Sequence, residues 1–69
     1  MTALTKTQTK ALKLLRQWDG DLSPDFEDDI GCHGAACDAV VGSLIKNGYI
    51  IVGAWGTYPL TDKGREALS

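Results

Sequence analysis

Stop signals containing glycine divide most of this chain into helix-length segments: Asp19-Gly20, Gly31 and Asn47-Gly48. Glycine adopts the left-handed backbone geometry of a helix C-terminus at low cost, so each signal marks the end of a helix. In the segments before these signals, apolar side chains recur at spacings of three and four, which is the period of one helical face. The predicted helices span residues 5–18, about 24–30 and 35–47.

The helix starts carry matching signals. Thr5 and Gln8 form a capping box, in which each side chain accepts a hydrogen bond from the other residue's backbone N–H. Ser23 is a favourable N-cap, and Pro24 suits the first position of a helix. Thr61 is expected to cap a short final helix, residues 62–68. The apolar residues expected in the core are Leu4, Ala11, Leu12, Leu15, Trp18, Phe26, Ile30, Cys37, Val40 or Val41, and Leu44.

The segment after the third predicted helix has a different character. Residues 49–52 and 57–60 are rich in β-branched and aromatic side chains, and the glycine-bounded residues 53–56 lie between them. This pattern is typical of a β-hairpin. We therefore predict one domain, residues 1–69, of the α+β class and mostly α: three helices, a hairpin and a short C-terminal helix.

This order of elements resembles the winged helix-turn-helix regulators of the MarR-like and PadR-like families. The likeness lies in "LTKTQTKALKLL", in "LSPDFEDDIGC" and in "VVGSLIKNGYI" followed by "YPLTDKGREAL". The resemblance implies a winged helix-turn-helix fold in which the hairpin is the wing. It also implies binding to duplex DNA, with the third helix in the major groove and the wing on the adjacent backbone.

The charge pattern argues against duplex DNA as the main partner. The net charge is −2 and the sequence pI is about 5.0, whereas DNA-binding domains are usually basic. No Lys or Arg occurs between Arg16 and Lys46. The exposed face predicted for the third helix carries Asp38 and small side chains, and none of these is a strong reader of bases. The interval between Arg16 and Lys46 holds most of the acidic residues of the chain: Asp19, Asp21, Asp25, Glu27, Asp28, Asp29 and Asp38.

We therefore predict a non-catalytic protein that binds a protein partner, as a small adaptor or inhibitor of the kind that phages and mobile elements encode. Trp55 lies between glycines at the expected tip of the wing, and Trp is enriched among interface hot spots. An equally simple interpretation of the acidic face is a solvated surface. The predicted partner-binding residues are Asp25, Asp28, Asp29, Ala35, Asp38, Ala39, Gly42 and Trp55.

The alternative hypothesis is a DNA-binding transcriptional regulator that uses the first and third helices and the wing. Lys6, Lys10 and Lys13 share one face of the first helix, although exposed lysines are common on any helix. The residues for this alternative are Lys6, Lys10, Lys13, His33, Ser43 and Lys46.

Catalytic and metal sites are not expected. Cys32, His33 and Cys37 are the only soft ligands in the chain, and a structural zinc site needs four. No phosphate-binding glycine loop is present, and we expect no cofactor. The two cysteines are expected to be reduced in a cytoplasmic protein without signal peptide or membrane segment. We expect a monomer or a weak homodimer.

Overall fold

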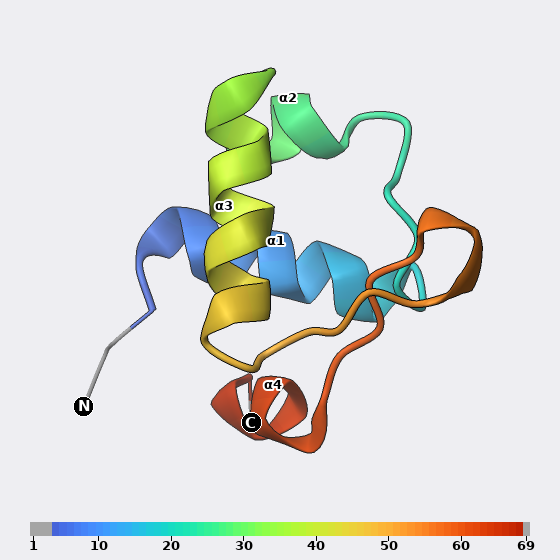
Figure 1. Ribbon diagram of the computed structural model, residues 1–69. Helices are drawn as coiled ribbons and strands as arrows, with labels where there is room; N and C mark the ends of the chain where they lie inside the picture. Colours follow the sequence, from blue (N-terminus) through green and yellow to red (C-terminus); the bar gives the residue numbers. More distant parts are fainter. Residues whose placement is uncertain (1–3, 69) are drawn as a thin grey trace.

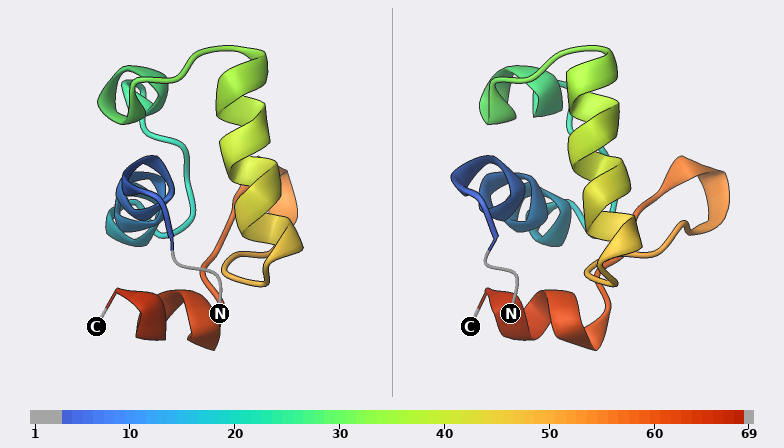
Figure 2. Two further views of the ribbon diagram at one scale, coloured as in Figure 1. Left: turned by 90° about the vertical axis from the view of Figure 1, so that its left-hand side faces the viewer. Right: turned by 60° about the vertical axis from the view of Figure 1, so that its left-hand side comes forward.

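The computed structural model describes residues 4–68 and shows a helical fold (Figure 1). Helix α1 crosses α3 and packs against both α2 and α3, while α4 lies across the far end of α3 from α2 (Figures 1 and 2). The elements are α1 (Lys6–Gln17), α2 (Phe26–Ile30), α3 (Ala35–Lys46), the 3₁₀ turn η1 (Ala54–Gly56) and α4 (Asp62–Ala67).

Most helix ends form where the sequence signals predict. The Gln8 N–H donates to Thr5 Oγ1 at 3.0 Å, and the Thr5 N–H donates to Gln8 Oε1 at 2.9 Å, so the capping box is confirmed. Gly31 ends α2 with a φ of 76°. Thr61 caps α4 by accepting a hydrogen bond from the Gly64 N–H at 3.1 Å. These signals act through neighbouring residues, which explains why they can be read from the sequence.

The start of α2 differs from the prediction. The helix begins at Phe26, because residues 24 and 25 form a turn in which the Phe26 N–H donates to the Ser23 carbonyl at 3.1 Å. Ser23 therefore does not cap the helix. Its hydroxyl is buried and has no hydrogen-bond partner among residues 4–68.

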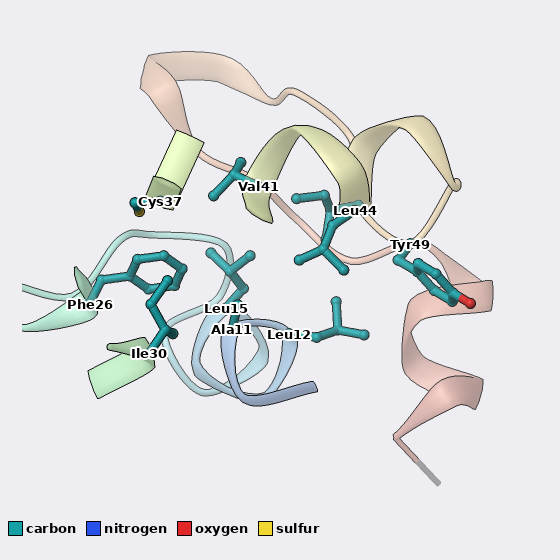
Figure 3. Close-up of a cluster of buried hydrophobic side chains, with 10 residues drawn as sticks. Ala11, Leu12, Leu15, Phe26, Ile30, Cys37, Val41, Leu44 and Tyr49 are labelled. Atoms are coloured by element: carbon teal, nitrogen blue, oxygen red, sulfur yellow. The ribbon is translucent and has the colours of Figure 1, made fainter. Parts of the chain in front are cut away.

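The core lies between α1, α2 and α3 and extends to the segment after α3 (Figure 3). Leu12, Leu15 and Leu44 are fully buried in it. Trp18, which was expected in this core, is 44% exposed, because it caps the end of α1 beyond the buried cluster. The buried residues are Ala11, Leu12, Leu15, Phe26, Ile30, Cys37, Val41, Leu44, Tyr49 and Ile50.

The predicted β-hairpin is wrong. The two arms after α3 run antiparallel, but residues 4–68 contain no strand and only an isolated bridge between Ile50 and Leu60. The Ile51 N–H donates to the Pro59 carbonyl at 3.0 Å, and Pro59 has no N–H to return the bond. The Gly53 N–H donates to the Thr57 carbonyl at 2.8 Å.

The remaining donors of this segment bind elsewhere. The Thr57 N–H turns back to the Ala54 carbonyl at 3.2 Å, and the Tyr58 N–H donates to the Gly20 carbonyl at 2.6 Å. In an antiparallel ladder, hydrogen-bonded residue pairs exchange two bonds, whereas the pairs Ile51 with Pro59 and Gly53 with Thr57 each have one. The winged helix-turn-helix class is therefore replaced by a helical fold in which residues 51–59 form an irregular loop, called the 51–59 loop below.

Candidate binding surfaces

The 51–59 loop carries the most exposed large apolar side chains among the described residues. Trp55 is 99% exposed, Val52 is 67% exposed and Ile51 is 53% exposed. Trp55 also has a φ of 60°, in the left-handed region that bulky residues avoid. In the right-hand view of Figure 2 the loop projects outward past α3, and its base lies beside the turn that follows α1.

The base of this loop is held by close backbone contacts. A side chain at Gly20 would collide with the Pro59 backbone, because a Cβ would lie 2.9 Å from the Pro59 nitrogen. A Cβ at Gly53 would lie 2.5 Å from Thr57 Oγ1, and that hydroxyl donates to the Ala54 carbonyl at 2.8 Å. Backbone fixed in this way holds Trp55 out in solvent.

Two of the acids on α2 stabilise the turn into α3. Glu27 Oε2 accepts a hydrogen bond from the Gly34 N–H at 2.7 Å, at the N-terminus of α3, where the helix dipole favours an anion. Asp28 Oδ1 lies 2.7 Å from His33 Nε2 and forms an ion pair with the protonated ring. Asp28 was predicted to lie on a partner surface, and the structure shows that its carboxylate already has an intramolecular contact.

The other predicted acids face solvent. Asp25, Asp29 and Asp38 are exposed and make no hydrogen bond or ion pair through their side chains within residues 4–68. We call these three carboxylates the acidic surface. They lie on α3 and around α2, which approach each other at one end of the fold (Figure 1).

The small residues predicted for this surface are also exposed. Ala35, Ala39 and Gly42 lie on the outer side of α3, and a Cβ at Gly42 would meet no atom within 4 Å. A partner could therefore approach the α3 backbone closely here. Figures 1 and 2 show the 51–59 loop apart from α2, which lies at the other end of α3, so the residues predicted as one surface lie in two regions.

The residues of the DNA-binding alternative are also separated. Lys6, Lys10 and Lys13 line an open depression on α1, with Leu4 and Thr9, whose volume is about 500 Å³. No carboxylate lines this depression, so these lysines could meet an anionic partner.

Two further members of that set make intramolecular contacts. Ser43 is half-buried; its hydroxyl accepts a hydrogen bond from Gln8 Nε2 at 2.9 Å and donates to the Val40 carbonyl at 2.7 Å. His33 pairs with Asp28, as described above, and Lys46 is exposed at the end of α3. Ser43 thus joins α1 to α3 and is less available to a nucleic acid than the sequence implied.

The ion pair of His33 predicts a pH dependence. The hydrogen bond to Asp28 raises the pKa of His33 above its ordinary value of 6.5, and the charges of Asp28 and Glu27 act in the same direction. A raised pKa means that the folded state favours the protonated ring, so this stabilisation is present below pH 6.5 and is lost as the pH rises through the folded-state pKa. NMR titration of the His33 ring should show the raised pKa, and Asp28→Asn should lower it.

Asp25→Asn is the matched control for this titration, because Asp25 is not among the groups that shift the pKa of His33. A titration midpoint that stays the same in Asp28→Asn would show that the ion pair does not form in solution.

The thiols and acids do not form a metal centre in the described part of the chain, where no three His, Cys, Asp or Glu side chains gather to hold an ion. Burial raises the pKa of the Cys37 thiol, and the charges of Glu27 and Asp38 add to this effect. The thiol is therefore protonated at neutral pH, whereas metal binding and nucleophilic attack need the thiolate. Both Cys32 and Cys37 are unpaired.

The exposure of Ile51 and Val52 was not predicted, because residues 49–52 were expected to form a strand. The sequence signal against a regular strand pair was Pro59, because proline cannot donate to a β-ladder. The lack of charged residues from Asn47 to Thr61 is more typical of a buried segment and gave no sign of this exposure.

Comparison of the chain with known proteins found no matching family model, no matching curated protein and no matching solved structure. Within residues 4–68, no helix has the length and apolar character that crossing a bilayer requires.

Proposed function

We propose that this chain is a small non-catalytic binding protein that contacts another protein through the 51–59 loop and acts as an adaptor or inhibitor. The observation that carries the proposal is Trp55, which is 99% exposed. Complete exposure of a Trp ring at a projecting loop gives no stability to the fold, while the same ring buried at an interface is a frequent hot spot.

The backbone at Trp55 supports the same proposal. A left-handed conformation costs a residue with a Cβ roughly 1–2 kcal/mol, which glycine or asparagine would largely avoid. Trp55 holds this conformation at a φ of 60° without any burial that would compensate. Unfavourable backbone geometry concentrates at binding sites, because folding alone does not explain it.

The acidic surface favours a proposed partner that carries positive charge. Asp25, Asp29 and Asp38 would attract a basic protein surface and repel a nucleic acid backbone. Because all three are exposed, salt should weaken their contribution steeply. The 51–59 loop lies apart from α2, where Asp25 and Asp29 are located, so one partner must span both regions or two partners must bind.

We expect Trp55→Asn to raise the free energy of unfolding by about 0.5–1 kcal/mol, since asparagine tolerates a positive φ and no buried contact is lost. Chemical denaturation of the two proteins measures this difference. Trp55→Val is the matched contrast, because a β-branched residue disfavours this geometry and should lower stability. A loss of stability in Trp55→Asn would instead indicate that the ring packs on the fold.

The binding test uses a photo-crosslinking amino acid in place of Trp55 in living cells, followed by identification and purification of the captured protein. Binding to that protein is then measured with Trp18→Phe, in which Trp55 is the remaining tryptophan. The emission of Trp55 should shift to shorter wavelength on binding, and Trp55→Ala should weaken affinity at least tenfold. Equal affinity of Trp55→Ala and the unmodified protein would reject the proposal.

The second candidate function is binding to nucleic acid, which the depression lined by Lys6, Lys10 and Lys13 favours. Phosphate contacts by these lysines would give an affinity that falls steeply with salt. Fluorescence anisotropy with random and genomic duplexes at low salt distinguishes the two functions. Tight binding that Lys10→Ala weakens and Trp55→Ala does not would favour nucleic acid over protein.

We further propose a cytoplasmic location. The unpaired state of Cys32 and Cys37 agrees with a reducing compartment, where thiols are not oxidised to disulfides.

A further inference from the structure

The outer edge of the 51–59 loop has backbone groups without partners. The N–H groups of Ile51 and Gly53 both point to the opposite arm, where they donate to Pro59 and Thr57. Backbone groups of successive extended residues point to alternate sides, so the N–H and C=O of Val52 point outward. Val52 makes no hydrogen bond within residues 4–68.

The opposite edge of the loop is covered by the segment between α1 and α2. The Tyr58 N–H donates to the Gly20 carbonyl at 2.6 Å, and Gly20 approaches the Pro59 backbone so closely that no side chain fits between them. The loop can therefore extend its hydrogen bonding on the Val52 side.

The side chains near Val52 suit an apolar interface. Ile51 and Trp55 are exposed, and no charged residue occurs from Asn47 to Thr61. A surface without charge can approach an identical surface with no like-charge repulsion, whereas the acidic surface would repel its own copy. Asp29 on α2 and Asp25 at its start lie apart from the loop, because α2 packs at the other end of α3 from the segment that follows this helix (Figures 1 and 2).

We propose that the 51–59 loop pairs with the same loop of a second copy of this chain, antiparallel and around a two-fold axis at Val52. The N–H of each Val52 donates to the C=O of the other, and this exchange uses both groups that the monomer leaves unpaired. The side chains of Ile51 and Trp55 project from the faces of the paired loops, where they can contact the other copy. The inference rests on the proposed role of the loop as a protein-binding surface, and it names the partner of that loop.

The dimer should be weak. Two Trp rings bury about 300–500 Å² together, and a loop of this size adds little to that area. Stable complexes bury about 1,200 Å² or more, so this pairing belongs with transient contacts. Each dimer would display two acidic surfaces, which allows a basic partner to bind at two points.

Sedimentation velocity from about 10 µM to about 1 mM tests the pairing, because an interface smaller than those of stable complexes should dissociate within this range of protein concentration. The average mass should rise from 7.4 kDa toward twice that value with concentration. Val52→Pro removes the N–H donor and Val52→Lys places two cations at the axis, so both should stay monomeric. Val52→Ile keeps the N–H and the apolar side chain, and it should dimerise like the unmodified protein.

Circular dichroism confirms that each variant is folded before sedimentation, and Val52 is exposed enough for these changes to leave the core intact. A monomer at every concentration, or a dimer that persists in folded Val52→Lys, overturns the inference. A monomer whose Trp55 still binds another identified protein overturns the inference and leaves the proposed function standing. In the remaining outcome, the dimer requires Val52 and crosslinking at Trp55 captures no other protein. This result supports the inference and rejects the adaptor role.

Discussion

Leu44→Ala is expected to lower the free energy of unfolding by about 3 kcal/mol, because Leu44 is fully buried between α1 and α3. The substitution removes buried methyl groups and leaves a cavity that the neighbouring helices fill only in part. A domain of this length has a total stability of roughly 3–10 kcal/mol, so the variant should be partly unfolded at moderate temperature.

Chemical denaturation followed by circular dichroism measures this loss. Leu22→Ala is the matched control, because it makes the same chemical change at a side chain that is 47% exposed. We expect its cost to be about 1 kcal/mol or less, as is usual away from the core. Similar losses in the two variants would contradict the core described here.

Gly64→Ala is the second change with a large expected effect. Gly64 lies in α4, and a Cβ at this position would overlap the carbonyl oxygen of Tyr49. That oxygen accepts the Thr61 N–H at 3.0 Å, so it cannot move away without breaking the start of α4. The Cβ would therefore push α4 off the segment after α3, at a cost of roughly 3 kcal/mol.

Gly42→Ala provides the contrast within the same protein. Gly42 lies in the middle of α3, and a Cβ there would meet no atom within 4 Å. Alanine should therefore raise the free energy of unfolding by up to about 1 kcal/mol, since glycine is a poor helix former. Thermal unfolding measures the stability of both variants. If Gly64→Ala were as stable as Gly42→Ala, the contact between α4 and Tyr49 would be refuted.

The helices of this fold could be predicted because their signals are local. Thr5 bonds to Gln8 three residues away, and Gly31 ends α2 through its own backbone freedom. The apolar stripes also identified Leu12, Leu15 and Leu44 as core residues, because helical periodicity decides which side chains share a face.

The loop after α3 could not be predicted from the same kind of signal. The residues 49–52 and 57–60 have strand-like composition, yet the Tyr58 N–H donates to Gly20, which lies far away in the sequence. Composition describes how well a residue fits a sheet and says nothing of a competing acceptor elsewhere. Pro59 was the one sequence signal that a β-ladder between these residues would be incomplete.

The candidate site was predicted in part. The exposure of Trp55, Asp25 and Asp29 follows from their positions in a turn and around a short helix. Other contacts depend on distances that only folding creates. These are the hydrogen bonds from Gly34 to Glu27 and from Gln8 to Ser43, and the ion pair of His33 with Asp28. These contacts separate carboxylates that hold the fold together from those that are free for a partner.

The amino-acid order alone was enough to place the four helices, since caps, glycine stops and apolar periodicity act within a few residues. The packing of distant segments decided the rest of the fold. The Tyr58 N–H donates to the Gly20 carbonyl, the Tyr49 carbonyl fills the space beside Gly64, and Trp55 remains exposed to solvent. A backbone donor bonds to whichever acceptor the folded chain brings within about 3 Å, and sequence neighbours do not specify that acceptor.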